Sequence, residues 1–171
     1  MSKAVLISIR PKWCEKIVSG EKTIEVRKNR PKLETPFKAY IYCTTGRPDL
    51  NIPISQERLM QDYLNTGSMK SLNCPHGNGK VIGEFTCDRI YELAPLNHAP
   101  DNVEQQACLT REEIVRYLKG VGYGWHISDL KIYDTPRELR EFTGLRQTKF
   151  GAEPVTITRP PQSWCYVEEL P

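Results

Sequence analysis

Several features that would assign this 171-residue chain to a class at once are missing from it. No stretch approaches the roughly 18 consecutive apolar residues that a membrane-spanning helix requires. The apolar part of the first ten residues is also too short for a signal peptide and has the composition of a β-strand instead. We therefore expect a cytoplasmic protein that does not cross a membrane.

The sequence also lacks a Cys-x-x-Cys pair, although it has six cysteines and three histidines. This removes the ligand spacing of the usual zinc fingers and redox motifs. A zinc site could still be assembled from Cys74 and His76 together with Cys43 and Cys87 on flanking segments. We expect no metal and no cofactor, and reduced cysteines of which several pack as small apolar side chains.

Negative charge is scarce only in the first part of the chain. Residues 1–38 carry ten Lys and Arg against four Glu, a balance of +6, whereas the rest carries 14 Lys and Arg against 17 Asp and Glu, a balance of −3. Such asymmetry is typical of a basic face for phosphate or another anion, on a mildly acidic body. A solvated lysine-rich surface would have the same charge pattern.

Strands dominate the secondary structure that the patterns predict. Residues rich in β-branched and aromatic side chains predict strands at 4–9, 23–28, 37–43, 80–87 and 164–168, with a weaker one at 130–133. Helices are predicted at 11–19, at 55–67, after a capping box at Thr110 and after another at Thr135 that ends near Gly144. Loops are expected at 94–109, 122–126 and 145–163.

These elements predict one α+β domain over residues 1–171. Gly, Pro, Asn and Ser are frequent at 44–78, which we interpret as an insertion between two strands. Strand and helix do not alternate regularly, so a parallel doubly wound sheet is not expected. The fold class we predict is a small mixed β-barrel or curled sheet with peripheral helices.

The densest group of chemically active side chains lies near the start of the chain. A strand, a helix and a glycine turn lead into a second strand, which brings Ser8 and Arg10 near Lys22, Glu25 and Arg27. In one interpretation the cations grip a phosphate or base while Glu25 accepts a hydrogen bond from a base amino group. In the other, Glu25 and Arg27 simply pair across a partly exposed sheet face.

Aromatic side chains give a second argument for a nucleic-acid ligand. Trp125 and His126 lie in the glycine-containing loop at 122–126, and Ser163 and Trp164 open the last strand. Rings beside a basic cleft can stack on an unpaired base. Alternatively, Trp125 plugs the end of the barrel, Trp164 belongs to the core, and His126 is either an acid or base group or a polar surface residue. Trp13 is assigned to the inner stripe of the first helix.

The N-terminal segment resembles the opening of the ASCH family, whose domains have a PUA-like β-barrel. The resemblance rests on residues 7–11 and 17–27, where Gly20, Lys22 and Arg27 match the Gly-x-Lys-x-x-x-x-Arg hallmark. Residues 79–85 resemble the central barrel strand, and 160–170 the terminal strand of bacterial and phage-encoded members. The resemblance implies binding of RNA or a nucleotide-like ligand in a cleft beside the first helix.

Some members of this family are hydrolases that remove an acyl group from modified cytidine, and others cut RNA. In these members, the hydrolytic site is built from a Lys and a Thr of the glycine-lysine stretch and from a later Glu. Lys22 matches the lysine and Glu104 could match the later glutamate, with Gln105 as close in register. The threonine position is Glu25, and Thr23 fills a different place in the motif.

This departure speaks against the acyl-hydrolase mechanism. A neighbouring Glu25 is expected to favour the charged form of Lys22, whereas a base must be neutral. Glu25 could itself serve as general base for a water molecule. The residues alone leave open whether the protein changes its ligand or only binds it.

Our first prediction is an RNA- or nucleotide-binding module. Arg10, Lys22 and Arg27 are predicted to grip phosphate or base edges, Ser8 and Glu25 to orient the ligand, and Trp125 and Trp164 to stack on it. His126 and Ser163 are further candidates at the same site. The alternatives are a hydrolase of the ribonuclease or cytidine amidohydrolase type, and an adaptor that uses residues 44–78 to contact a protein partner of unknown identity.

Overall fold

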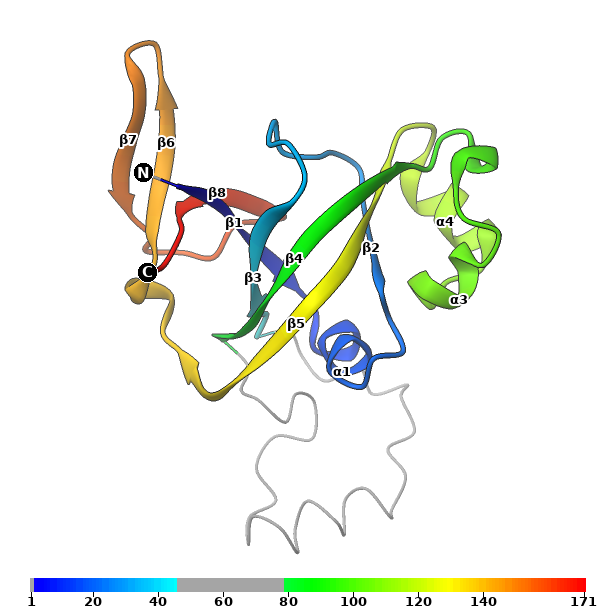
Figure 1. Ribbon diagram of the computed structural model, residues 1–171, viewed down its shortest axis with the longest axis horizontal. Helices are drawn as coiled ribbons and strands as arrows, with labels where there is room; N and C mark the ends of the chain where they lie inside the picture. Colours follow the sequence, from blue (N-terminus) through cyan, green and yellow to red (C-terminus); the bar gives the residue numbers. More distant parts are fainter. Residues whose placement is uncertain (1, 46–78) are drawn as a thin grey trace, which may run out of the picture.

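The computed structural model describes residues 2–45 and 79–171. They form one eight-stranded mixed sheet in the order β2-β5-β4-β3-β1-β8-β6-β7, flanked by a few short helices (Figure 1). The strands are β1 (Lys3–Ile9), β2 (Ile24–Arg27), β3 (Phe37–Cys43), β4 (Lys80–Glu92), β5 (Tyr123–Arg137), β6 (Thr143–Thr148), β7 (Gly151–Thr156) and β8 (Trp164–Glu168). The helices are α1 (Pro11–Val18), α3 (Val103–Ala107) and α4 (Arg111–Leu118), with single 3₁₀ turns η1 (Leu96–His98) and η2 (Leu139–Glu141).

Strand β1 runs through the middle of the sheet and is buried on both faces. It pairs in parallel with β3 and antiparallel with β8. Because successive side chains of a strand point to opposite faces, Ile7 and Ile9 belong to one core cluster, and Ala4 and Leu6 to another. A strand covered on both sides carries apolar residues on both faces, which explains the apolar run at residues 4–7; the buried Ser8 interrupts this run.

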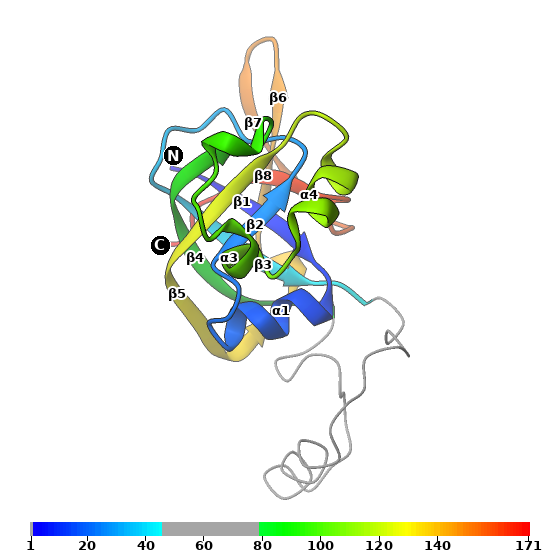
Figure 2. The same ribbon diagram turned by 90° about the vertical axis from the view of Figure 1, so that its right-hand side faces the viewer.

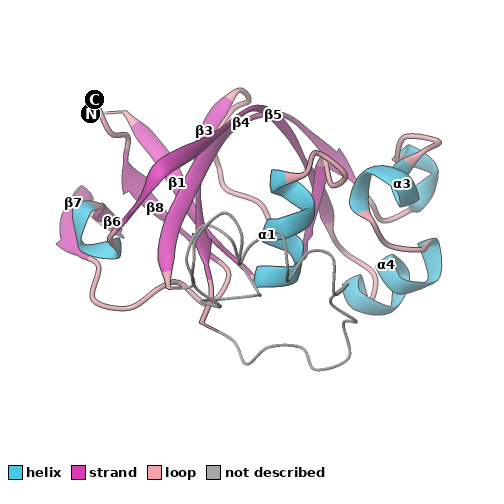
Figure 3. Cartoon of the chain, turned by 90° about the horizontal axis from the view of Figure 1, so that it is seen from below, coloured by secondary structure: helices cyan, strands magenta, loops and turns pink. Residues whose placement is uncertain are grey.

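The two helices α3 and α4 lie together, apart from α1 (Figure 3), and pack on the outer face of β2. Ile24 and Val26 of β2 pack there with Val103, Ile114 and Leu118 in a third core cluster. The capping box at the start of α4 is formed as predicted, with the Thr110 hydroxyl accepting from the Glu113 backbone N–H. The opposite face of β2 is therefore free to carry Glu25 and Arg27 towards β1.

The sheet curls until its edge strand β2 approaches β1, as the side view shows (Figure 2). These strands are not neighbours in the sheet order. The Arg27 guanidinium of β2 nevertheless donates a 2.6 Å hydrogen bond to the Ser8 carbonyl oxygen of β1. A side chain thus connects β2 and β1 where no backbone pairing joins them. The predicted α+β, barrel-like fold class is confirmed.

Most of the predicted elements are confirmed. The strands at 37–43 and 164–168 have the predicted bounds, and the first two strands and the first helix differ by a residue or two at their ends. Gly20 has the positive φ of 82° that its place after α1 requires. The weak strand at 130–133 is the middle of β5, and the strand at 80–87 extends to residue 92.

Four local predictions are wrong. The loop expected at 94–109 contains the turn η1 and the helix α3, and the other three fail because tertiary pairing outweighs a local signal. The capping box at Thr135 starts no helix, because β5 remains paired with β4 as far as Arg137 and only the turn η2 follows. Residues 145–163 contain the β6–β7 hairpin, in which Pro154 is tolerated because β7 is the last strand of the sheet. The predicted loop at 122–126 is strand, since Gly124 lets Ile24 of the neighbouring β2 pack closely.

Some predictions fall on residues 46–78, outside the described part of the chain. They are the helix at 55–67, most of the 44–78 insertion, and a zinc site with Cys74 and His76. The organisation of residues 1–171 as one domain also stays a prediction. Within residues 2–45 and 79–171, no group of three His, Cys, Asp or Glu side chains is arranged to hold a metal ion. No helix of this described part has the length and apolar character needed to span a membrane.

Candidate functional site

A pocket of about 470 Å³ opens between α1, β2 and α4. Five of the residues predicted to bind a ligand line it: Ser8, Arg10, Lys22, Glu25 and Arg27. It is completed by residues that were not predicted as ligand contacts: Lys12, Trp13, Val26, Thr44, Leu109, Glu113, Tyr117 and Gln162. The strand–helix–turn–strand unit at the N-terminus therefore does gather its polar side chains in one place.

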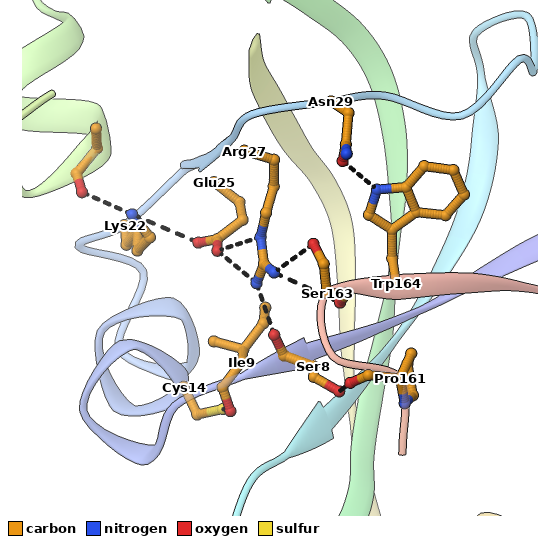
Figure 4. Close-up of polar contacts among 11 residues, drawn as sticks. Ser8, Ile9, Cys14, Lys22, Glu25, Arg27, Asn29, Pro161, Ser163 and Trp164 are labelled. Carbon is orange, nitrogen blue, oxygen red and sulfur yellow. Dashed lines mark hydrogen bonds and ion pairs between the residues drawn. The ribbon is translucent and has the colours of Figure 1, made fainter. Parts of the chain in front are cut away.

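Lys22, just before β2, forms a row of alternating charge with Glu25 and Arg27 of β2 (Figure 4). Lys22 Nζ lies 3.6 Å from Glu25 Oε2. On the other side, Arg27 Nε donates a 3.0 Å hydrogen bond to Glu25 Oε1, and the terminal nitrogen Nη2 lies 2.9 Å from the same oxygen. All three residues are buried, so Glu25 and Arg27 do pair as one interpretation expected, but on a buried face and not on a partly exposed one.

Arg27 directs its donors into the protein. Beyond Glu25 and the Ser8 carbonyl oxygen, it donates from Nη1 to the Ser163 hydroxyl at 3.1 Å and to the Ser163 carbonyl oxygen at 3.4 Å. A guanidinium has five N–H donors in a fixed fork, and these contacts occupy its three nitrogens. Arg27 is therefore suited to hold Glu25 in place rather than to grip a phosphate.

Lys22 is the most deeply buried cation of the pocket, with a relative exposure of 2%. Its Nζ donates a 2.7 Å hydrogen bond to the Ala107 carbonyl oxygen and lies 4.9 Å from the centroid of the Trp13 ring. Burial lowers the pKa of Lys22, and the attraction of Glu25 offsets this only in part. Glu25 does favour the charged form of Lys22, as expected, but burial disfavours that form more strongly, so the pKa lies below its ordinary value.

Glu25 keeps part of its capacity to accept hydrogen bonds. Its Oε1 receives the contacts of Arg27, whereas Oε2 faces Lys22 at 3.6 Å, longer than an ordinary hydrogen bond. A carboxylate has about four lone-pair sites. The floor of the pocket therefore offers an oxygen acceptor directly beside the ammonium donor of Lys22.

The mouth of the pocket carries cations and two aromatic rings. Arg10, exposed, occupies the N-cap position of α1, and Lys12 Nζ lies 4.7 Å from the Trp13 ring centroid. Tyr117 projects from α4 with 45% exposure, and Lys28 Nζ lies 5.2 Å from its ring centroid. Sequence reasoning missed both rings as ligand contacts: Trp13 does pack partly against the core, and Tyr117 lies on the outer face of an amphipathic helix.

Trp125 is not available to a ligand. It has no exposed surface and packs in the core against Phe37, with ring centroids 5.8 Å apart. Its indole nitrogen has no hydrogen-bond partner. The predicted stacking role of Trp125 is therefore wrong, and its alternative interpretation as a core residue of the barrel holds, because the segment is a strand whose residues alternate between the two faces.

The remaining candidates lie outside the residues that line the pocket. The Trp164 indole donates to Asn29 Oδ1 at 3.1 Å and packs against Trp125 and Tyr166. His126 Nδ1 lies 2.6 Å from Asp88 Oδ1. Ser163 reaches the site through Arg27 (Figure 4) and through its carbonyl oxygen, which accepts a 2.9 Å hydrogen bond from the Ser8 backbone N–H.

The residues considered for the hydrolase mechanism are also separated. Glu104 Oε1 accepts a 2.7 Å hydrogen bond from the Arg111 backbone N–H, and so serves the first turn of α4 rather than the pocket. The Thr23 hydroxyl donates to Gln106 Oε1, towards α3. The carboxylate of α4 that does line the pocket is Glu113. In the sequence, Glu113 served only as part of the capping box that predicts the helix, and it was not predicted as a site residue.

Comparison with known proteins gives the following relatives. The family model described as ASCH domain matches residues 7–132. A crystal structure of ASCH from Zymomonas mobilis is 18% identical, with a TM-score of 0.55, over 97% of this chain and 88% of that chain. A point mutant of the same protein gives 18% identity and a TM-score of 0.54 over 97% and 91%. No curated protein matches the chain in sequence, and the matches do not bear on a phage origin.

Proposed function

The chain belongs to the ASCH domain family, with its PUA-like fold, and on this premise we propose that it is an RNA- or nucleotide-binding module. The ligand enters the pocket beside α1. Arg10 and Lys12 contact phosphate at the mouth, while Lys22 and Glu25 contact the part of the ligand that reaches the floor. Arg27 and Ser8 act as positioning residues.

One observation carries this proposal: cations outnumber carboxylates among the described residues that line the pocket, and one of these cations, Arg10, is exposed. Arg10, Lys12, Lys22 and Arg27 line it against only two carboxylates, Glu25 and Glu113. Lysine and arginine side chains that neutralise phosphates dominate affinity for nucleic acids. The charge balance of the pocket matches the excess of +6 in residues 1–38.

The test is the affinity of a fluorescently labelled, eight-nucleotide single-stranded RNA, measured by anisotropy at low salt. Arg10→Ala is expected to weaken binding about tenfold, since it removes one charge-assisted contact, and to lower the salt dependence by about 0.7 in slope. Arg146→Ala is the matched control, because Arg146 is 68% exposed, lies on β6 and does not line the pocket. Equal affinities of the two variants would contradict the proposal.

A second candidate function is hydrolysis of RNA or of an acylated cytidine in the same pocket. The observation that favours it is Lys22, a buried amine with a lowered pKa 3.6 Å from a carboxylate. A lysine whose pKa is lowered has a larger neutral fraction and can act as a base. Glu25, in the position where related hydrolases have threonine, is then the group that activates water.

Turnover is tested by incubating the protein with single-stranded RNA and, separately, with acylated cytidine. Lys22→Met and Glu25→Gln should both abolish product formation while the proteins remain folded by circular dichroism. Glu104→Gln should leave the rate unchanged, because Glu104 caps α4 outside the pocket. RNA binding without any product would leave the binding module as the function.

A further inference from the structure

Two aromatic rings line the pocket from two different helices, and phosphate binding gives neither of them a role. Tyr117 lies on α4, whose Ile114 and Leu118 already supply the buried face of that helix. Packing therefore does not account for Tyr117, which remains 45% exposed. Trp13 lies on α1 and is only partly buried against the core.

The floor of the pocket favours a ligand that is not itself an anion. Glu25 is buried beside Lys22, and a phosphate placed against its carboxylate would be repelled. A nucleobase is neutral, and its edge carries hydrogen-bond donors and acceptors. Such an edge matches the free acceptor capacity of Glu25 Oε2 next to the Lys22 ammonium.

We propose that Trp13 and Tyr117 form the stacking surface for one unpaired nucleobase, whose edge contacts Glu25 and Lys22. This rests on the proposed RNA- or nucleotide-binding function and names the part of the ligand that enters the pocket. The phosphate of the same nucleotide stays at the mouth with Arg10 and Lys12. The base has to be unpaired, because its hydrogen-bonding edge and at least one of its faces must be free.

The environment of the rings agrees with this assignment. Lys28 lies 5.2 Å from the Tyr117 ring centroid and Lys22 lies 4.9 Å from that of Trp13. Rings with nearby cations combine stacking with attraction for a nucleotide's negative charge. The volume of about 470 Å³ lies within the range of pockets that hold small molecules, about 300–1,000 Å³.

The first experiment compares cytidine 5′-monophosphate with ribose 5-phosphate, which has the same phosphate and sugar but no base. Wild-type protein is expected to bind the nucleotide about 5- to 150-fold more tightly, the range that stacking on aromatic side chains spans. Tyr117→Ala should remove most of this difference, and Tyr117→Phe should restore it, because the phenyl ring keeps the stacking face. Equal binding of the two compounds by wild-type protein would overturn the inference.

The second experiment uses the eight-nucleotide single-stranded RNA and the same RNA with its bases removed at successive single positions. Tyr117→Ala is expected to weaken binding of the intact RNA and to abolish the difference between intact RNA and the most affected abasic one. The matched control is Phe150→Ala, which removes an 86%-exposed aromatic ring at the β6–β7 turn, outside the pocket residues. RNA affinity that depends on Arg10 but not on Tyr117 would overturn the stacking inference and leave the proposed function intact.

Trp13 gives an independent optical signal. Binding of cytidine 5′-monophosphate should quench tryptophan fluorescence in wild-type protein, and the quenching should be lost in Trp13→Phe. Trp125 is buried in the core, and Trp164 is held by Asn29 outside the pocket. Quenching that persists in Trp13→Phe would show that the base does not contact this ring. Absence of binding to every RNA and nucleotide tested would instead contradict the proposed function itself.

Discussion

The guanidinium of Arg27 on β2 donates a 2.6 Å hydrogen bond to the backbone carbonyl oxygen of Ser8 on β1. The two strands are not neighbours in the sheet order, so this contact joins the edge of the sheet to its centre. The same guanidinium holds Glu25 at the floor of the pocket. One side chain therefore couples the curl of the sheet to the geometry of the candidate site.

We predict that Arg27→Ala lowers the free energy of unfolding by about 3–5 kcal/mol, the cost of removing one partner from a buried ion pair. The variant leaves Glu25 with only Lys22, whose own charged form burial disfavours, and leaves the Ser8 carbonyl oxygen without this donor. Urea unfolding monitored by circular dichroism at neutral pH measures the change.

Two further variants separate the role of charge from that of geometry. Arg27→Lys keeps the charge but cannot form the fork of hydrogen bonds, so it should recover only part of the loss. Arg146→Ala removes an exposed ion pair with Glu153 and is expected to cost less than about 1 kcal/mol. A cost for Arg27→Ala as small as that for Arg146→Ala would contradict the closing role of Arg27.

Local sequence patterns were sufficient for the parts of the fold that depend on local properties. The largely apolar β1 and the capping box at Thr110 could be recognised because burial on both faces and helix capping each leave a pattern in the residues themselves. The short motif with Lys22 and Arg27 located the pocket. The fold class followed from the predominance of strands without regular alternation with helices.

The features of the fold and site that the sequence did not predict depend on contacts between residues far apart along the chain. Arg27 contacts Ser163, which lies 136 positions away along the chain, and nothing in its own neighbourhood indicates that its donors turn inward. Trp125 was misplaced because Gly124 suggested a loop, whereas the glycine lets β2 pack closely against β5. Whether Tyr117 lines the pocket depends on where α4 packs in the fold, and the amphipathic pattern of α4 alone does not define that position.

We predict that Gly83→Ala destabilises the protein by about 1–3 kcal/mol or more, the usual cost of overpacking. A Cβ at residue 83 would lie 2.4 Å from the Lys131 carbonyl oxygen, and this backbone atom of β5 cannot move without disturbing its pairing with β4. Thermal and urea unfolding measure the effect.

Gly144→Ala is the matched control for Gly83→Ala. Its Cβ would meet side-chain atoms of Ile157 and Val155 at 3.0 Å and a backbone oxygen, that of Val155, only at 3.3 Å, and side chains can shift more easily than a paired strand. We expect a clearly smaller loss of stability for this variant. The reverse order would show that the close approach of β4 and β5 at Gly83 is relieved by strand movement.

We predict that the stability of the wild-type protein, relative to Lys22→Met, rises with pH in the alkaline range. The pKa of Lys22 is lowered in the folded protein from the ordinary value of 10.5, chiefly by burial. Between the lowered pKa and 10.5 the unfolded chain binds more protons than the folded one, so the free energy of unfolding increases with pH. Below the folded pKa both states are protonated, and this contribution no longer changes.

The measurement is the difference in unfolding free energy between wild type and Lys22→Met at several pH values from 7 to 10.5. Taking the difference removes the groups that titrate in both proteins, such as Tyr133 and Cys87, whose pKa values are raised. A difference that stays constant over this range, or that falls as pH rises, would show that burial does not lower the pKa of Lys22.

The last prediction concerns Cys165, which is half-buried on β8. Burial raises the pKa of its thiol to about 11, and the thiolate is the form that reacts with alkylating agents. Raising the pH from 8 to 10 should therefore speed its alkylation about 100-fold, against about fourfold for a free thiol of ordinary pKa. Mass spectrometry of the peptide that contains Cys165 measures the rate, and the same peptide from urea-unfolded protein is the control that should follow the fourfold change. A native rate that also rises only about fourfold would mean that limited access, not a raised pKa, protects this thiol.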